Sequence, residues 1–306
     1  MGTTYSVKLK VRGNKLNKNK IHTDLDQILS DINQSMSTYI SNSELSRFNQ
    51  SRDTGPHVLS DDLYQVIRHA NDVSVISNGA FDVTVGALVN LWGFGPGPLD
   101  HKIPAESTID DIKRHIGYDK LVFNDQNKSI RKTDPAIYVD LSGIAKGFAV
   151  DKVAYYLDSL KVPDYLVEIG GELIGKGFNG EDKPWQIGIE QARPLERAVQ
   201  RIINLDNIAM ATSGDYRNYF EQDGVRYSHT IDPVSGKPIK HNLASVTVID
   251  KSTMHADAMA TAFMVLGPDK TIGLANKLNM PVYMIIKTEN GFDERYNDVF
   301  KAYLSD

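Results

Sequence analysis

The chain has 306 residues, of which 41% are hydrophobic and 24% charged, and its formal net charge is -5. These proportions are those of a globular protein with a sizeable core. They argue against a nucleic-acid-binding protein, because no block of five or more basic residues is present. They also argue against a membrane-spanning helix, because no run approaches the ~18 apolar residues that one needs.

The chain contains no cysteine, which excludes disulfides, thiolate metal sites and cysteine nucleophiles. It opens with "MGTTYSVKLKV", which has none of the charged and then apolar pattern of a leader peptide. We therefore expect either a cytoplasmic protein or one whose leader has been removed. Composition alone does not distinguish the two.

The first half of the chain predicts a strand, two helices and a hairpin. Residues 3–11 alternate as in a strand, and the apolar residues of 21–48 recur at helical spacing. Residues 60–79 repeat the helical pattern, with Ser60 as N-cap and Gly79 as the stop. Apolar and polar residues alternate over 81–85, and a loop rich in Gly and Pro follows. Residues 121–132 predict a hairpin that turns at 125–128.

The second half predicts many strands and few helices. "AIYVDLSG" (136–143) predicts a strand that ends in a tight turn, followed by a helix to residue 160. Residues 164–177 read as two strands around a Gly-Gly break, and later segments favour further strands. Helices are expected at 255–267 and 269–279. The irregular order predicts an α+β fold with a large mixed or antiparallel sheet, forming one compact unit over residues 1–306.

The segment "HADAMATAFMVLG" (255–267) carries two polar residues in an apolar helix, Asp257 and Thr261. Residues four apart lie on the same helix face. Their carboxylate and hydroxyl can both bind a hard cation such as Mg²⁺. The alternative is that Asp257 caps or begins the helix while Thr261 bonds back to a carbonyl.

The segment "YVDLSGIAKGFAVD" (138–151) predicts a strand–turn–helix junction of the kind that binds phosphate. Asp140 ends the strand, Lys146 lies in the first helical turn, and the Gly143 carbonyl could bind a metal. The alternative is a capped helix with a solvated lysine. In "EIGGEL", the glycine pair 170–171 indicates either a β-bulge or positive φ angles.

His229, in "YSHTIDPVSGKPI", could act as a general base near neutral pH, although a lone histidine is more often structural. Tyr39 and Phe81 could cover a planar ring, although packing explains aromatic residues more often.

These motifs, in this order and over nearly the whole chain, resemble the ApbE family of FAD:protein FMN transferases, also described as flavin-trafficking proteins. The matching segments are "MGTTYSVK", "MSTY", "NGAFDVTVGALVNLWGFG", "VDLSGIAKGFAVD", "EIGGEL", "ATSGDYRNYF", "HTIDPVSGKP" and "ADAMATAFMVLG".

The resemblance implies an ApbE-like fold and an enzyme that splits FAD at its pyrophosphate. FMN passes to a Thr or Ser hydroxyl of an acceptor flavoprotein through a phosphodiester bond, and AMP leaves. Known acceptors include subunits of the sodium-translocating NADH:quinone reductase. Family members require Mg²⁺, and some also hydrolyse FAD to FMN and AMP.

The resemblance also implies roles for particular residues. The metal ligands would be Asp257, Thr261 and the carbonyl of Gly143. The FAD pocket would include Met1, Tyr39, Ala80, Phe81, Asp82, Asp140, Lys146 and Ile231. From the chemistry of the reaction, His229 is the candidate for activating the acceptor hydroxyl, and His255 is the second choice.

Family members usually carry a signal peptide that ends in a lipidated cysteine, which this chain lacks. We therefore expect a periplasmic protein held at the inner membrane by a lipid anchor that is absent from this chain. Two other functions compete with the transferase. One is an Mg²⁺-dependent FAD pyrophosphatase, and the other is a flavin-binding protein without turnover.

Overall fold

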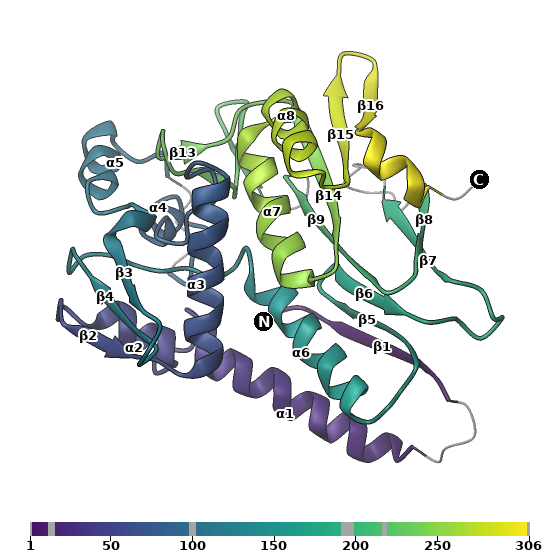
Figure 1. Ribbon diagram of the computed structural model, residues 1–306. Helices are drawn as coiled ribbons and strands as arrows, with labels where there is room; N and C mark the ends of the chain where they lie inside the picture. Colours follow the sequence, from purple (N-terminus) through teal and green to yellow (C-terminus); the bar gives the residue numbers. More distant parts are fainter. Residues whose placement is uncertain (1, 12–15, 98–101, 191–198, 216–218, 305–306) are drawn as a thin grey trace. The chain divides into compact units, whose positions relative to one another are not determined.

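The computed structural model describes residues 2–11, 16–97, 102–190, 199–215 and 219–304, with helices and strands in irregular order (Figure 1). The chain divides into two compact units. The first comprises Met1–Ser30, Lys146–Arg217 and Asn242–Asp306, and the second comprises Asp31–Ala145 and Asn218–His241. The α+β class is confirmed, whereas a single catalytic unit over 1–306 stays a prediction.

The first unit is built on a seven-stranded sheet in the order β1-β5-β6-β9-β14-β15-β16. All neighbouring pairs are antiparallel, as expected. The strands are β1 (Tyr5–Lys10), β5 (Asp164–Ile169), β6 (Glu172–Lys176), β9 (Ile208–Gly214), β14 (Leu243–Asp250), β15 (Val282–Thr288) and β16 (Gly291–Tyr296).

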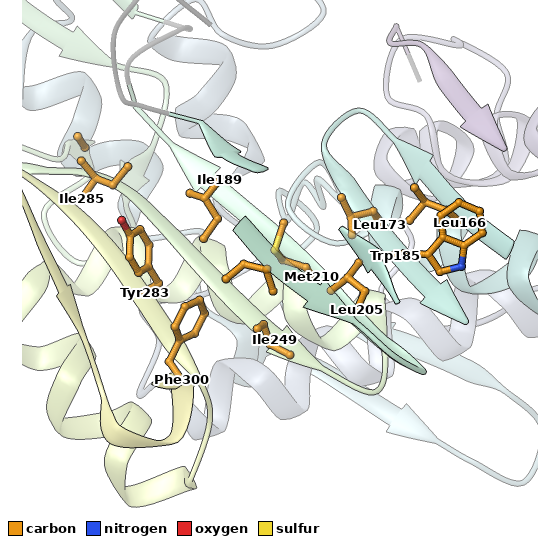
Figure 2. Close-up of a cluster of buried hydrophobic side chains, with 12 residues drawn as sticks. Leu166, Leu173, Trp185, Ile189, Leu205, Met210, Ile249, Tyr283, Ile285 and Phe300 are labelled. Carbon is orange, nitrogen blue, oxygen red and sulfur yellow. The ribbon is translucent and has the colours of Figure 1, made fainter. Parts of the chain in front are cut away.

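Both faces of this sheet are covered, which explains why β14 is buried at every position from Leu243 to Ile249 rather than at alternate positions. Helix α7 (Thr253–Leu266) packs on β9, β14 and its neighbour α8 (Pro268–Leu278). The hairpin of β7 (Trp185–Glu190) and β8 (Val199–Leu205), with the 3₁₀ helix η2 (Asp298–Tyr303), packs on side chains of the sheet. Figure 2 shows the resulting core, in which Met210 and Ile249 lie between Leu205 and Phe300.

The second unit holds shorter elements. Its helices are α2 (Glu44–Gln50), α3 (Asp61–Ile76), α4 (Gly86–Leu91), α5 (Glu106–Lys113) and η1 (Tyr118–Lys120). Its strands form three small sheets: β2 (Pro56–Val58), β4 (Ser129–Lys132) and β3 (Leu121–Asn124); β10 (Tyr219–Gln222) and β11 (Val225–Ser228); β12 (Ile231–Asp232) and β13 (Lys237–Pro238).

Two long helices contain a boundary between the units. Helix α1 (Lys18–Met36) begins in the first unit and ends in the second, and α6 (Ala145–Ser159) begins at the last residue of a second-unit segment. No helix in the described ranges is long and apolar enough to cross a membrane.

Several local predictions are confirmed. The Ser60 hydroxyl accepts a hydrogen bond from the Leu63 N–H as N-cap of α3, and Gly79 has a positive φ just beyond the end of that helix. Strands β3 and β4 pair as the predicted hairpin. In each case the signal lies within a few residues, so sequence reasoning could find it.

The strand predicted at residues 136–143 is wrong, and Tyr138 makes only an isolated bridge to Val85. Residues 81–85, in which apolar and polar residues alternate, form turns that lead into α4, and there the Asp82 carboxylate accepts the Thr84 N–H. For Gly170 and Gly171 the β-bulge is wrong and the positive φ angles are confirmed, because the pair forms the two-residue turn between β5 and β6 with φ of 63° and 105°.

Candidate active site

The residues predicted from the sequence belong to both compact units. Lys146, Asp257 and Thr261 lie in the first unit. Tyr39, Ala80, Phe81, Asp82, Asp140, Gly143, His229 and Ile231 lie in the second. Met1 lies outside the described residues.

Asp257 is a buried carboxylate in the second turn of α7, only 4% exposed. The cap of this helix is Ser252, whose hydroxyl accepts a hydrogen bond from the His255 N–H. The alternative in which Asp257 caps or begins the helix is therefore wrong. Thr261 follows one turn later on α7 and is half-buried.

The Asp257 carboxylate is held from α6 by two groups. Its Oδ2 accepts the Gly147 N–H at 3.0 Å, and its Oδ1 lies 3.3 Å from the Lys146 Nζ. The two helices approach so closely that a Cβ on Gly147 would lie 2.7 Å from the Thr253 carbonyl carbon and 2.8 Å from the Asp257 Cβ. Only glycine fits there without displacing one helix.

The contact between these helices is reciprocal. Asp151, one turn further along α6, accepts hydrogen bonds from the Ser252 hydroxyl and from the Thr253 and Met254 N–H groups, at 2.8 to 3.0 Å. These N–H groups are among those that the first turn of an α-helix leaves without intrahelical partners. Each helix therefore supplies a carboxylate to backbone donors near the start of the other, which fixes the position of Asp257.

Glu172, the first residue of β6, completes this cluster, although sequence reasoning assigned it no role. Its Oε1 lies 2.8 Å from the Lys146 Nζ, and its side chain is 3% exposed. Burial raises the pKa of Glu172 to about 8, despite the adjacent ammonium of Lys146. A signal was present in the sequence, since Glu172 is an acidic residue at the start of a largely apolar strand.

Lys146 therefore bridges two buried carboxylates and is not the solvated lysine of the alternative interpretation. Burial by itself lowers the pKa of Lys146, but the attraction of Asp257 and Glu172 outweighs burial and raises the pKa above its ordinary value. The ammonium therefore stays charged, and the side chain is 29% exposed.

In the second unit, Asp82 organises the loop that follows α3. Its Oδ1 accepts the Thr84 N–H and hydroxyl at 2.8 and 2.6 Å, and its Oδ2 accepts the Tyr118 N–H at 2.9 Å. Burial raises the pKa of Asp82. Ala80 and Phe81, just before it, are also buried. Because both Asp82 oxygens are engaged, its carboxylate shapes the loop.

Asp140 lies beside this loop. Its N–H donates to the Val83 carbonyl, and its Oδ1 accepts the Ser142 N–H at 2.7 Å. The neighbouring Val139 exchanges two hydrogen bonds of 2.8 Å with the side-chain amide of Asn49, which occupies the groups that a neighbouring strand would use. This exchange explains why the predicted strand at 136–143 does not form.

Tyr39 is 67% exposed. Partial burial and the charge of Asp140 raise the pKa of its phenol. The predicted flavin contacts Tyr39, Asp82 and Asp140 all lie in the second unit. The Asp140 N–H binds the carbonyl of Val83, the residue after Asp82. An exposed phenol ring of this kind can stack on a planar ligand.

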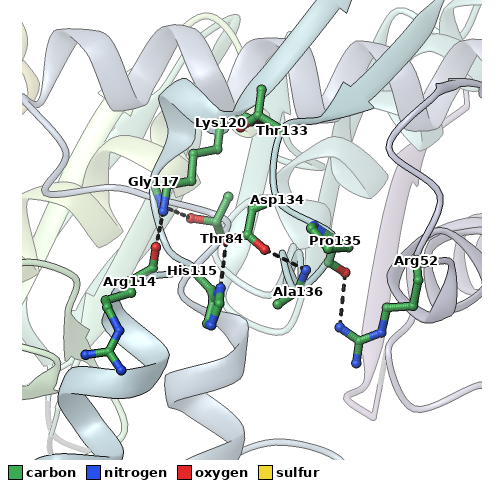
Figure 3. A network of polar contacts seen from close by, with 10 residues as sticks. All are labelled: Arg52, Thr84, Arg114, His115, Gly117, Lys120, Thr133, Asp134, Pro135 and Ala136. Carbon is green, nitrogen blue, oxygen red and sulfur yellow. Dashed lines mark hydrogen bonds and ion pairs between the residues drawn. The ribbon is translucent and has the colours of Figure 1, made fainter.

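A polar network supports the loops around Asp82 (Figure 3). The Thr84 hydroxyl accepts the Gly117 N–H at 2.8 Å, which ties the loop to the segment before η1. Further along, Asp134 accepts the Ala136 N–H and contacts His115, while Arg52 donates to the Pro135 carbonyl.

His229 is half-buried, with its ring edge-on to Phe94 at 6.3 Å between centroids. Ile231 is buried in a cluster with Leu88, Trp92, Ile109 and Phe220. The Trp92 indole N–H donates to the Gly236 carbonyl, which anchors the loop that follows His229. His255, the second candidate base, lies on α7, where burial lowers the pKa of its imidazole.

The donors on α7 suit one class of metal. Among the described residues no group of three or more His, Cys, Asp or Glu side chains could hold an ion by itself. A single carboxylate with a hydroxyl one turn away offers hard oxygen ligands only. Mg²⁺ binds in this manner, through one or two carboxylates completed by water and substrate phosphates. The residues present therefore fit Mg²⁺.

The chain is similar to proteins of known name. The model of the ApbE family matches residues 1–285. A Vibrio cholerae protein named FAD:protein FMN transferase is 45% identical, covering 100% of this chain and 91% of its own length. A Haemophilus influenzae protein of the same name is 46% identical, with coverages of 98% and 88%.

Solved structures agree with this similarity. The structure named flavin transferase ApbE from Vibrio cholerae has a TM-score of 0.92 at 44% identity, covering 99% of this chain and 96% of its own. The ApbE protein of Thermotoga maritima has a TM-score of 0.88 at 28% identity, covering 99% of both chains. The expected fold is confirmed.

Proposed function

The chain belongs to the ApbE family, and on that basis we propose that it is an FAD:protein FMN transferase. In this reaction the oxygen of a Thr or Ser hydroxyl on an acceptor flavoprotein forms a bond to the FMN phosphorus. The bond from that phosphorus to the bridging pyrophosphate oxygen breaks, and AMP leaves. We propose a flavoprotein such as a subunit of sodium-translocating NADH:quinone reductase as the acceptor.

The observation that carries the proposal is the buried Asp257 carboxylate in the second turn of α7, which does not cap its own helix and is approached by Lys146. We propose that Asp257, Thr261 and the Gly143 carbonyl hold Mg²⁺. When bound, Mg²⁺ neutralises negative charge on the pyrophosphate oxygens. The Gly147 N–H, which in an uninterrupted helix would donate to the Gly143 carbonyl, donates to Asp257 instead, and this supports Gly143 as a ligand.

The chain's own residues account for the remaining steps. The Lys146 ammonium attracts the phosphates, and its position in the first turn of α6 suits an anion. Tyr39, Ala80, Phe81, Asp82, Asp140 and Ile231 form the proposed flavin-nucleotide pocket, with Met1 predicted to join them. We propose His229 as the general base that takes the proton of the acceptor hydroxyl.

The test is transfer of FMN to an acceptor protein that carries a Thr or Ser site, measured by in-gel flavin fluorescence in the presence of FAD and Mg²⁺. We expect Asp257→Ala to lower the rate about 100-fold or more. The matched control is Asp269→Ala, which removes an exposed carboxylate on α8 paired with Arg295 and leaves the rate unchanged. Full activity of Asp257→Ala would overturn the metal assignment.

Two other functions are outcomes of the same assay. Rapid AMP release from FAD without an acceptor would identify an FAD pyrophosphatase in which water takes the place of the hydroxyl. Tight FAD binding with no AMP under any condition would identify a flavin-binding protein without turnover. The buried Asp257 argues against the latter, since binding alone needs no cation beside the pyrophosphate.

We also propose a periplasmic location, with anchoring at the inner membrane through a lipid. This proposal is supported by the family to which the chain belongs. Fractionation of the protein expressed from its natural gene, followed by immunoblotting, tests it. Recovery in the cytoplasmic fraction would contradict it.

A further inference from the structure

Glu172 is a buried carboxylate to which the proposed reaction gives no role. Its Oε1 lies 2.8 Å from the Lys146 Nζ, and its Oε2 is buried without a hydrogen-bond partner in the part of the chain that the structure describes. A buried carboxylate with an unpaired oxygen is costly. We therefore look for the role of the Glu172 carboxylate in its interaction with Lys146.

Lys146 is confined from two further directions. The Gly170 turn passes beside its stem, so that a Cβ at Gly170 would lie 3.3 Å from the Lys146 Cδ. Its second charged partner, Asp257, is more distant, at 3.3 Å from Nζ compared with 2.8 Å for Glu172. Glu172 is thus the closer partner of the ammonium, and Asp257 is shared.

The sharing matters once a divalent cation approaches Asp257. A dication and an ammonium repel each other, and both compete for the Asp257 carboxylate. Without a second carboxylate, Lys146 would either block the cation or be expelled from the site. Glu172 offers the ammonium a place that leaves the Asp257 oxygens available.

We infer that Glu172 is a positioning residue that retains the Lys146 ammonium beside the phosphates when Asp257 binds Mg²⁺. This inference rests on the proposed function and adds a residue to its site. Glu172 acts through Lys146 and not on substrate, because its side chain is 3% exposed and contacts the Lys146 ammonium.

The test is calorimetric titration of Mg²⁺ into the protein saturated with ADP, which carries the pyrophosphate of FAD but holds no flavin to transfer. At pH 9, above the raised pKa of about 8, Glu172 is ionised. There we expect Glu172→Gln, which keeps the shape and removes the charge, to raise the Kd for Mg²⁺ about tenfold. Glu172→Asp keeps the charge on a shorter side chain and is expected to give a smaller rise. Thermal unfolding of each variant checks that it folds.

To test whether Glu172 acts through Lys146, the titration is repeated with Lys146→Met and with the double variant Lys146→Met, Glu172→Gln. There the competing ammonium is gone, so Glu172→Gln is expected to change the Kd by less than about threefold. An equal rise in both backgrounds would show that Glu172 acts on the cation by its charge alone, which would overturn the positioning role.

Two further outcomes distinguish this inference from the proposed function. If the unsubstituted protein binds Mg²⁺ and Glu172→Gln binds it equally well, the inference fails and the proposed function stands. If the unsubstituted protein binds no Mg²⁺ with ADP, the metal site of the proposed function fails, and the inference fails with it.

Discussion

The two units use the carboxylates of the candidate site differently. In the first unit, Asp257 and Glu172 converge on the ammonium of Lys146, and helices and a strand of a large sheet hold all three residues. In the second unit, Asp82 and Asp140 accept hydrogen bonds from backbone N–H groups of loops. The first pair of carboxylates binds a charged side chain, and the second pair holds the backbone of loops in place.

The difference follows from the surrounding structure. Regular elements satisfy their own backbone groups, so side chains projecting from them are free to interact with each other and with ligands. Loops leave N–H groups without partners, and buried Asp side chains supply the acceptors. We therefore expect substitutions of Asp257 and Glu172 to affect cation binding and catalysis, and those of Asp82 and Asp140 to affect stability first.

The largest expected effect is that of Gly147→Ala, which breaks the contact between α6 and α7. The added Cβ would lie 2.8 Å from the Asp257 Cβ, so the helices must separate. We expect a loss of stability of about 3 kcal/mol and loss of FMN transfer, measured by urea unfolding and by flavin fluorescence. The control is Gly273→Ala in α8, whose Cβ would meet no atom within 4 Å. It should stabilise the protein slightly, and equal behaviour of the two variants would refute the close approach.

The next largest effect is the difference between Asp82→Asn and Asp257→Asn in stability and in FMN transfer. We expect Asp82→Asn to lose about 1–3 kcal/mol of stability, because an amide nitrogen cannot accept the hydrogen bonds that Asp82 now receives. Asp257→Asn should unfold at nearly the unsubstituted urea midpoint and lose most of its Mg²⁺-dependent activity. Urea unfolding and FMN transfer, measured on both variants, check this. The contrast between the units would be lost if both variants lost stability and activity in the same proportion.

A smaller effect is expected from Asp151→Ala, which removes the acceptor for the first N–H groups of α7. By analogy with the loss of a helix cap, we expect the free energy of unfolding to fall by about 1–2 kcal/mol. Asp298→Ala, which removes an exposed partner of Lys301 in η2, is the control and should change little. Chemical unfolding of both variants measures this. Equal stability of the two would show that Asp151 does not hold α7.

The smallest effect, counted per pH unit, is a pH dependence of the stability. Because the folded pKa of Glu172 is raised from 4.5 to about 8, the folded protein holds a proton that the unfolded chain has lost. Stability therefore falls as pH rises through this window, on the order of 1 kcal/mol per pH unit. Glu172→Gln lacks this dependence, so its stability relative to that of the unsubstituted protein should rise from pH 5 to 8. Urea unfolding in EDTA across this range measures the difference, and parallel curves would contradict the raised pKa.

Much of the fold was predictable because its signals are local. The cap at Ser60, the end at Gly79 and the spacing of Asp257 and Thr261 involve residues within a few positions of one another. The α+β class followed from the order of such segments. The resemblance to the ApbE family, carried by ordered motifs, predicted the family that the comparisons then showed.

The sequence by itself therefore determined those helices and strands whose signals are local, and that Asp257 and Thr261 share a helix face. Tertiary structure alone decided that residues 136–143 form no strand, because the amide of Asn49 comes from 90 positions away to occupy Val139. It also decided that Glu172 meets Lys146, and that the carboxylates of Asp151 and Asp257 each reach the start of the other's helix. Helical and strand patterns repeat over two to four residues, whereas these contacts join elements whose separation in the chain no periodicity encodes.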